Sequence, residues 1–180
     1  SFFPGGNPWA WYDMGNSNSY SGSGYTWSDL SGNGRNLTIE NGAYSSTGYS
    51  STPAWVWTGN DAKIDLQDDL SAVKTYIFIF GWTGSSNRQY LLSSTNAYAA
   101  RFHPTTSGVV MNGGATHTGE TQSTTVNGNA VTTSSQARTA TELNKLNIVA
   151  VRGFQMTESD AVFGASIRSR SYTAFSYCVD

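Results

Sequence analysis

The segment Trp27-Ser-Asp-Leu-Ser-Gly-Asn-Gly-Arg-Asn-Leu-Thr-Ile-Glu40 contains the pattern that predicts the fold of the whole chain. Ser31-Gly-Asn-Gly34 is a strong turn signal, because glycine and asparagine tolerate the backbone angles of tight turns. After the turn, residues 36–40 alternate, with Leu37 and Ile39 on one face, as in a half-buried strand. A tryptophan, a tight turn and an alternating strand in so short a stretch indicate β-structure.

The alternation of turn and strand continues on both sides of this segment. Short runs of β-branched, aromatic and alternating residues are typical of strands. We predict strands, or hairpins of two strands, at residues 9–14, 36–40, 54–58, 63–67, 75–82, 89–93, 97–102, 108–111, 124–132, 147–151, 161–167 and 172–179. Short strands in this number, separated by dense turn signals, predict an all-β sandwich or barrel.

Four local patterns make this prediction more specific. Residues 75–82 are the most apolar stretch and predict a central strand buried on both faces, and residues 147–151 predict a second buried strand. Asn127-Gly128 predicts the tip of a hairpin, and Asn41-Gly42 predicts another turn. Thr139-Ala-Thr-Glu142 fits a capping box, so a short helical turn is expected at residues 141–145.

The composition limits the classes of function. The chain has 180 residues, 12% of them charged, and a net charge of −2, which gives no general reason to bind nucleic acid or a membrane surface. Cys178 is the only cysteine, so no internal disulfide can form, and its apolar surroundings in the sequence predict a buried, inert thiol. The sequence has neither a P-loop nor a dinucleotide-binding fingerprint, and no cofactor is predicted.

The segment Tyr20-Ser-Gly-Ser-Gly-Tyr-Thr-Trp-Ser-Asp-Leu-Ser-Gly-Asn-Gly-Arg-Asn-Leu37, with Trp11-Tyr-Asp13 before it and Asn41-Gly42 after it, resembles the N-terminal signature of concanavalin A-like/laminin G-like domains of phage virion proteins. Such domains occur in tail fibres, head fibres and capsid decorations. The resemblance implies one jelly-roll sandwich of two antiparallel sheets over residues 1–180. It also implies that the chain continues beyond Asp180.

The same resemblance implies a function and a location. It implies a non-enzymatic module on the virion surface, assembled in the host cytoplasm, that takes part in host attachment. Its expected partners are other virion proteins and a host surface glycan, in a homotrimer or on a symmetric lattice, with neither nucleic acid nor membrane insertion. The first alternative is a receptor-binding, lectin-like tail-fibre domain. The second alternative is a glycoside hydrolase.

The hydrolase alternative depends on carboxylates. Some glucanases that share this fold place three acids as Glu-x-Asp-x-x-Glu on one strand, which points all three to one face. Here the corresponding stretch is Glu158-Ser-Asp160-Ala-Val-Phe163. Because phenylalanine stands where the general acid is needed, and retaining hydrolysis requires two carboxyl groups, no catalytic residue is predicted.

Aromatic side chains among Ser, Thr and Asn are the candidate glycan contacts. An aromatic ring can stack on the apolar face of a sugar while neighbouring hydroxyls and amides bind its hydroxyl groups. Strand spacing places Trp55 and Trp57 on one face, where they form either a part of the core or a stacking platform. The candidates are Tyr20, Tyr25, Tyr44, Tyr49, Trp55 and Trp57.

The quoted turn also resembles the first half of a calcium loop. Asp29, Ser31 and Asn33 supply oxygens at alternate positions before a glycine, with Ser31 in place of a stronger ligand, and Glu40 falls at the twelfth position. No flanking helices are evident, however. The other interpretation is that Asp29 accepts backbone hydrogen bonds within the turn while Trp27 packs beneath it. The second interpretation needs no ion, and no metal site is predicted.

Overall fold

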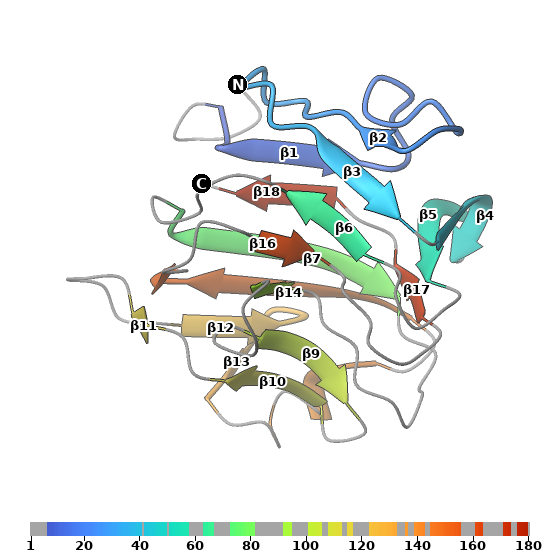
Figure 1. Ribbon diagram of the computed structural model, residues 1–180. Helices are drawn as coiled ribbons and strands as arrows, with labels where there is room; N and C mark the ends of the chain where they lie inside the picture. The colour runs from blue at the N-terminus through green and yellow to red at the C-terminus, as the bar shows by residue number, and fades with distance from the viewer. Residues whose placement is uncertain are drawn as a thin grey trace.

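The computed structural model describes residues 7–40, 42–49, 51–57, 63–66, 73–81, 92–94, 101–105, 108–112, 115–116, 123–132, 136, 139–142, 145–155, 161–163, 171–173 and 176–179. The chain folds into antiparallel β-sheets (Figure 1). Within these ranges, helical conformation is confined to Gln136, Thr139 and Ala140. The all-β prediction is therefore confirmed at the level of fold class. No helix of the described ranges is long and apolar enough to cross a membrane.

The first large sheet has six strands. In spatial order they are β1 (Ala10–Asp13), β18 (Ser176–Val179), β7 (Thr75–Gly81), β14 (Leu146–Arg152), β12 (Ser123–Val126) and β13 (Asn129–Val131). The pairing of β7 with β14 runs without interruption from Leu146 opposite Gly81 to Arg152 opposite Thr75. The central position predicted for the strand at residues 75–82 is confirmed, because β7 lies between β18 and β14.

The second large sheet has seven strands, and two small sheets complete the fold. The order in the second sheet is β10 (Gly108–Asn112), β9 (Arg101–Thr105), β8 (Leu92–Ser94), β16 (Ala161–Phe163), β6 (Lys63–Leu66), β3 (Leu37–Glu40) and β2 (Thr26–Trp27). The small sheets contain β17 (Ser171–Thr173), β5 (Thr52–Trp57) and β4 (Gly42–Tyr49), and β11 (Ala115–Thr116) with β15 (Phe154–Gln155).

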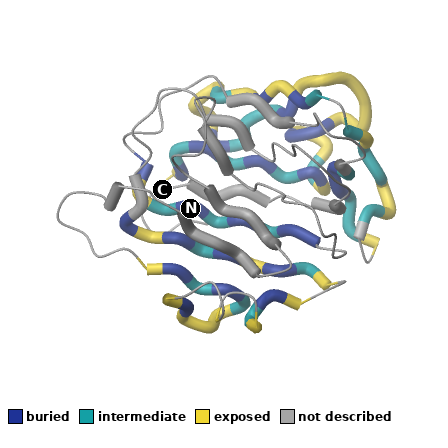
Figure 2. Tube along the Cα trace, turned by 60° about the horizontal axis from the view of Figure 1, so that its bottom comes forward, coloured by how far each residue is buried: buried dark blue, intermediate teal, exposed yellow. Residues whose placement is uncertain are grey.

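The core lies against one face of the six-stranded sheet. Tyr76 and Phe78 of β7 and Val149 of β14 are fully buried. Residues on the opposite face alternate with them along the strands (Figure 2): Ile77 is half-buried, and Ile148 is 49% exposed. The prediction that both faces of these strands are buried is therefore wrong. On this outer face Ile79 lies directly opposite Ile148, and cross-strand pairs of this kind shield each other only in part.

Aromatic rings join the two large sheets. Tyr12 of β1 and Trp27 of β2 are both buried, and their ring centroids are 5.5 Å apart. On the seven-stranded sheet Leu37 and Ile39 of β3 are buried, as their alternation predicted. Burial of large aromatic side chains contributes strongly to folding. The expectation that Trp27 is part of the core is therefore confirmed.

Turns and helical segments agree with the prediction in part. Asn127 and Gly128 have φ angles of 50° and 80° at the tip of the β12–β13 hairpin, as predicted. Gly42 belongs to β4 and not to a turn, and Asn41 lies outside the described residues. The predicted helical turn at residues 141–145 is wrong, because the helical residues precede Thr141, where the chain already bends. The side chain of Cys178 lies outside the described residues.

Candidate functional site

Asp29 is the centre of the turn that follows β2. Its Oδ1 accepts hydrogen bonds from the backbone N–H groups of Trp11 (3.0 Å) and Ser31 (2.8 Å). Its Oδ2 accepts from the hydroxyl of Ser31 (2.6 Å) and the backbone N–H of Arg35 (3.1 Å). Both carboxylate oxygens are thus saturated by protein donors. The interpretation of Asp29 as an acceptor of backbone hydrogen bonds is confirmed.

The other calcium candidates do not converge on Asp29. The Asn33 side-chain amide donates to the backbone oxygens of Pro8 (3.1 Å) and Trp9 (3.0 Å). Glu40 lies on β3, opposite Lys63 of β6. Within the described ranges, no group of three or more His, Cys, Asp or Glu side chains could hold a metal ion. The turn is therefore built by hydrogen bonds to its own backbone and to β1.

A cluster of three aromatic rings joins the loop after β1 to the β4–β5 hairpin. Tyr20 comes from the loop after β1, and Tyr44 and Trp55 lie directly opposite each other on β4 and β5. The Tyr20 ring centroid is 5.1 Å from that of Tyr44 and 6.1 Å from that of Trp55, the latter in an edge-to-face arrangement. The structure therefore brings together three of the six predicted glycan contacts.

These three rings differ in exposure. Tyr20 and Trp55 are each only 4% exposed, whereas Tyr44 is half-buried. The Tyr20 hydroxyl donates to the backbone oxygen of Gly24 (3.0 Å). Burial, and to a smaller extent the charge of the nearby Tyr44, raises the pKa of Tyr20 above the ordinary tyrosine value. Buried rings cannot stack on a ligand, so Tyr20 and Trp55 support the surface and Tyr44 reaches it.

The remaining candidates are placed as follows. Tyr25 is 74% exposed, the most exposed large hydrophobic side chain in the described ranges. The loop that carries it packs on the cluster, since a Cβ on Gly22 would lie 3.6 Å from Cε1 of Tyr44. The side chains of Tyr49 and Trp57 lie outside the described residues, as do Glu158 and Asp160.

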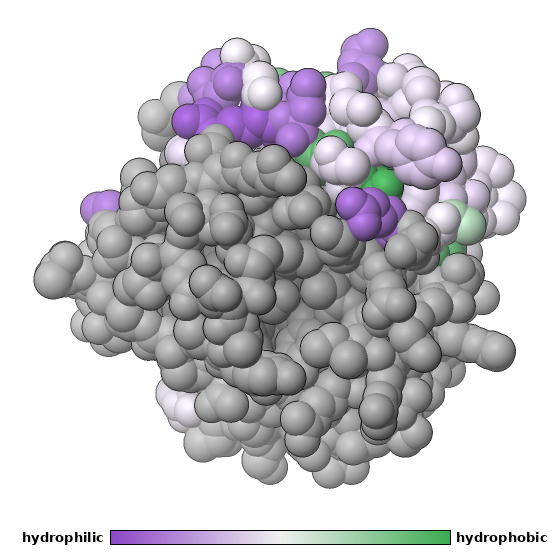
Figure 3. Space-filling model, viewed as in Figure 1, coloured by the Kyte–Doolittle hydropathy of each residue, from purple (hydrophilic) through white to green (hydrophobic). Residues whose placement is uncertain are grey.

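The loop of residues 15–25 and the β4–β5 hairpin together form a surface that we call the neutral aromatic surface. Residues 14–28 and 42–57 contain no Asp, Glu, Lys or Arg. In Figure 3 the described surface shows strongly hydrophilic residues gathered at the upper left and pale, near-neutral residues at the upper right. Serine, threonine and tyrosine supply hydroxyls and ring faces to this surface without any charge.

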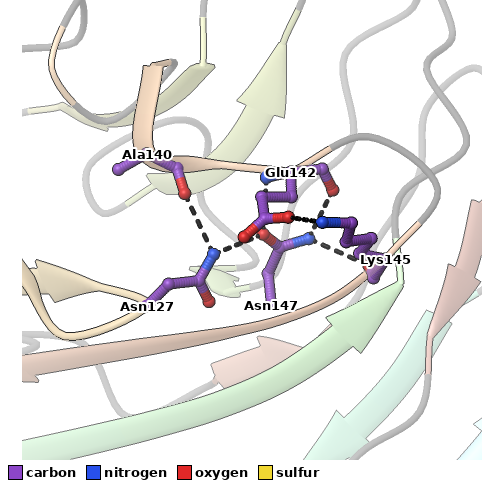
Figure 4. Close-up of polar contacts among 5 residues, drawn as sticks. All are labelled: Asn127, Ala140, Glu142, Lys145 and Asn147. Carbon is purple, nitrogen blue, oxygen red and sulfur yellow. Dashed lines mark hydrogen bonds and ion pairs between the residues drawn. The ribbon is translucent and has the colours of Figure 1, made fainter.

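A second polar cluster was not predicted from the sequence. Asn147 of β14 is fully buried. Its Oδ1 accepts from the Glu142 backbone N–H (2.7 Å) and the Asn127 side-chain amide (2.9 Å), and its Nδ2 donates to the backbone oxygens of Glu142 (2.8 Å) and Lys145 (3.0 Å) (Figure 4). One polar residue in an apolar strand run was the only signal of this site in the sequence.

The cluster around Asn147 is a structural clamp. The Asn127 amide also donates to the backbone oxygen of Ala140 (2.9 Å), and its Oδ1 accepts from the backbone N–H of Ile148 (2.8 Å). Glu142 and Lys145 form an ion pair at the exposed edge of the cluster. The contacts tie the hairpin tip to Ala140, Glu142, Lys145 and β14, and both polar atoms of the Asn147 side chain are used.

The described glycan candidates thus divide into buried supports and surface rings. Tyr20 and Trp55 hold the β4–β5 hairpin against the loop of residues 15–25. Tyr25 and Tyr44 present ring surface to solvent. No known protein family, no curated protein and no solved structure matches this chain.

Proposed function

We propose that this chain is a non-enzymatic binding module of a virus particle, and that its neutral aromatic surface contacts a host glycan. One observation carries the proposal: Tyr44 reaches solvent above a buried support of Tyr20 and Trp55, and Tyr25 is exposed on the same loop as Tyr20. A sugar ring buries its apolar face against such rings and bonds its hydroxyls to nearby polar groups. The buried support restricts the motion of Tyr44, which lowers the entropy lost on binding.

The absence of charge on this surface indicates the class of glycan. Acidic sugars carry carboxylates, which proteins bind most strongly through charged donors such as arginine. The neutral aromatic surface contains no arginine or lysine in residues 14–28 or 42–57. The proposed ligand is therefore a neutral glycan, recognised by stacking and by uncharged hydrogen bonds.

The jelly-roll architecture and the location on the virion are parts of the same proposal. A jelly-roll sandwich is supported by the two large antiparallel sheets and by the contact between Tyr12 and Trp27 that joins them. The virion location rests on the resemblance of the Tyr20–Leu37 segment, with Trp11-Tyr-Asp13 and Asn41-Gly42, to phage virion domains. The non-enzymatic reading is supported by Phe163, which occupies the place of a required acid in the hydrolase pattern.

A glycan array probed with the purified chain tests the proposal. We expect binding to neutral glycans, and Tyr25→Ala and Tyr44→Ala should each weaken it about tenfold, the loss expected for one aromatic contact. Asn129→Ala, at an exposed position of β13, is the matched control and should bind as the unmodified chain does. If the chain binds no neutral glycan on the array, or if binding survives both tyrosine changes, the proposed site is refuted.

A second candidate is a purely structural module that packs against other virion proteins. Ile148, which is exposed on the outer face of the six-stranded sheet, favours it, because the half-buried Ile79 of β7 lies directly opposite and apolar side chains that group on a surface often mark protein contacts. Ile148→Asp separates the two candidates. Loss of incorporation into particles with glycan binding intact would support the structural function.

A further inference from the structure

The edge of the small sheet formed by β17, β5 and β4 is unusual among the sheet edges of this protein. β4 is an edge strand, paired only with β5, and with eight residues it is the longest edge strand of the described part of the chain. Edge strands present a row of backbone N–H and C=O groups that can pair with another strand. Proteins usually block such edges with charges, prolines or covering loops.

The β1 edge of the six-stranded sheet shows how this protein blocks an edge strand. On β1, the Trp11 N–H donates to Asp29 and the Trp11 carbonyl accepts from the backbone N–H of Leu30 (2.7 Å). The Asp13 N–H donates to the hydroxyl of Ser19 (3.1 Å). The outer backbone groups of β1 are thus occupied by the loop and turn of residues 15–36, and this edge cannot accept another strand.

The edge of β4 has no such covering within the described ranges. There, the only hydrogen bond to its backbone outside the pairing with β5 comes from within β4, where the Gly48 N–H donates to the hydroxyl of Ser45 (2.8 Å). Ala43, Ser46 and Thr47 are exposed. The strand contains neither proline nor any charged residue. A β-bulge between Ser45 and Tyr49 leaves Gly42–Ser45 as the regular part of the edge.

We propose that the Gly42–Ser45 edge of β4 pairs with the same edge of a second copy of this chain, antiparallel about a two-fold axis. An open strand edge is complementary to another strand, because only an extended backbone matches its alternating donors and acceptors. The absence of charged residues on the β4 edge favours a second copy of this chain as the partner. A foreign peptide strand is selected by charges or pockets beside the edge, whereas an uncharged edge meets its own copy without repulsion.

This pairing is independent of glycan binding, but it has a consequence for it. Tyr44 belongs to the paired stretch, so the neutral aromatic surfaces of the two copies would lie near the same two-fold axis. Two linked sites bind a multivalent glycan more strongly than either site alone.

Sedimentation equilibrium of the purified chain over a range of concentrations tests the pairing. We expect a dimer with twice the 19.4 kDa mass of the monomer. Ala43→Lys should weaken the dimer about tenfold, because a lysine on the edge of each copy opposes the pairing. Ala130→Lys is the matched control, since Ala130 is also an exposed alanine on an edge strand, β13, and it should leave the dimer unchanged.

Two further measurements keep the result interpretable. An unchanged melting temperature of Ala43→Lys shows that the variant folds, and hydrogen exchange at residues 42–45 should slow as the protein concentration rises. A chain that stays at 19.4 kDa at every concentration would overturn the proposal. So would a dimer that Ala43→Lys leaves intact, because the copies would then meet through another surface.

Discussion

Asn147 shows how much stability one buried amide can contribute. Its four hydrogen bonds satisfy the whole amide inside the fold. We predict that Asn147→Ala lowers the free energy of unfolding by about 2–4 kcal/mol, because it removes packing and leaves the part-buried backbone groups of Glu142 and Lys145 without their amide partner. Urea denaturation measures this loss. Asn129→Ala, at an exposed position, should cost less than about 0.5 kcal/mol, and an equal loss in both variants would contradict the clamp.

Tyr20 gives a pH-dependent prediction. Burial raises its pKa in the folded chain, whereas in the unfolded chain it ionises near pH 10. The neutral form in the folded state therefore contributes stability that is present below about pH 10 and is lost as the pH rises through the raised pKa. Urea denaturation from neutral to alkaline pH should show this fall, and Tyr20→Phe should reduce its slope.

The β4–β5 hairpin depends on one close approach. A Cβ on Gly42 would lie closer to the Trp55 indole than real Cβ contacts allow. We predict that Gly42→Ala destabilises the chain by about 1–3 kcal/mol, because the indole must move out of its packed position. Thermal unfolding measures the shift, and near-ultraviolet circular dichroism should report the displaced indole. Gly42→Ala with an unchanged spectrum and melting temperature would show that the hairpin is not held by this contact.

Gly24→Ala is the control that separates the effect of a steric contact, as at Gly42, from the effect of backbone strain. Gly24 has a φ of 87° and open space around its Cβ position, so alanine there meets no atom within 4 Å. Its cost is the strain of a left-handed backbone, about 1 kcal/mol. It should leave the signal of the Trp55 indole unchanged.

Sequence patterns predicted the elements that depend on local chemistry. Asn127-Gly128 specifies a hairpin tip by its tolerance of positive φ angles, and the structure has these angles. Leu37 and Ile39 alternate and are buried as predicted. β4 was missed because its glycine, serine and threonine residues carry no apolar alternation. That strand is instead positioned by its pairing with β5 and by the contact of Tyr44 with Tyr20, which is remote in sequence.

The candidate site was predictable to a similar extent. The sequence indicated which aromatic residues stand among uncharged polar neighbours, but it could not separate buried rings from surface rings. That separation depends on the loop of residues 15–25 folding against β4 and β5. The fold places the Tyr20 ring against the rings of Tyr44 and Trp55 and leaves Tyr25 exposed. Asn147 was missed for the same reason, because its partners come from two other segments, the hairpin tip at Asn127 and the stretch with Glu142 and Lys145.

The two large sheets should unfold as one cooperative unit, because Tyr12 and Trp27 join them in the core. We predict that Trp27→Ala lowers the free energy of unfolding by about 3–5 kcal/mol, the usual cost of removing a fully buried large aromatic side chain. Trp27→Phe keeps a ring against Tyr12 and should cost less. Tyr25→Ala, two residues away but exposed, should cost less than about 0.5 kcal/mol.

Two probes followed during urea denaturation test whether the sheets are coupled. Far-ultraviolet circular dichroism reports on all strands, and tryptophan fluorescence reports on the indole surroundings. If the rings join the sheets, both probes of the unmodified chain should follow one transition, as a two-state domain does. Trp27→Ala should then move both transitions together to lower urea, because neither sheet can keep its buried face covered without the other. Separate transitions in the unmodified chain, or a Trp27→Ala variant that is as stable as it, would mean that each sheet is stabilised on its own.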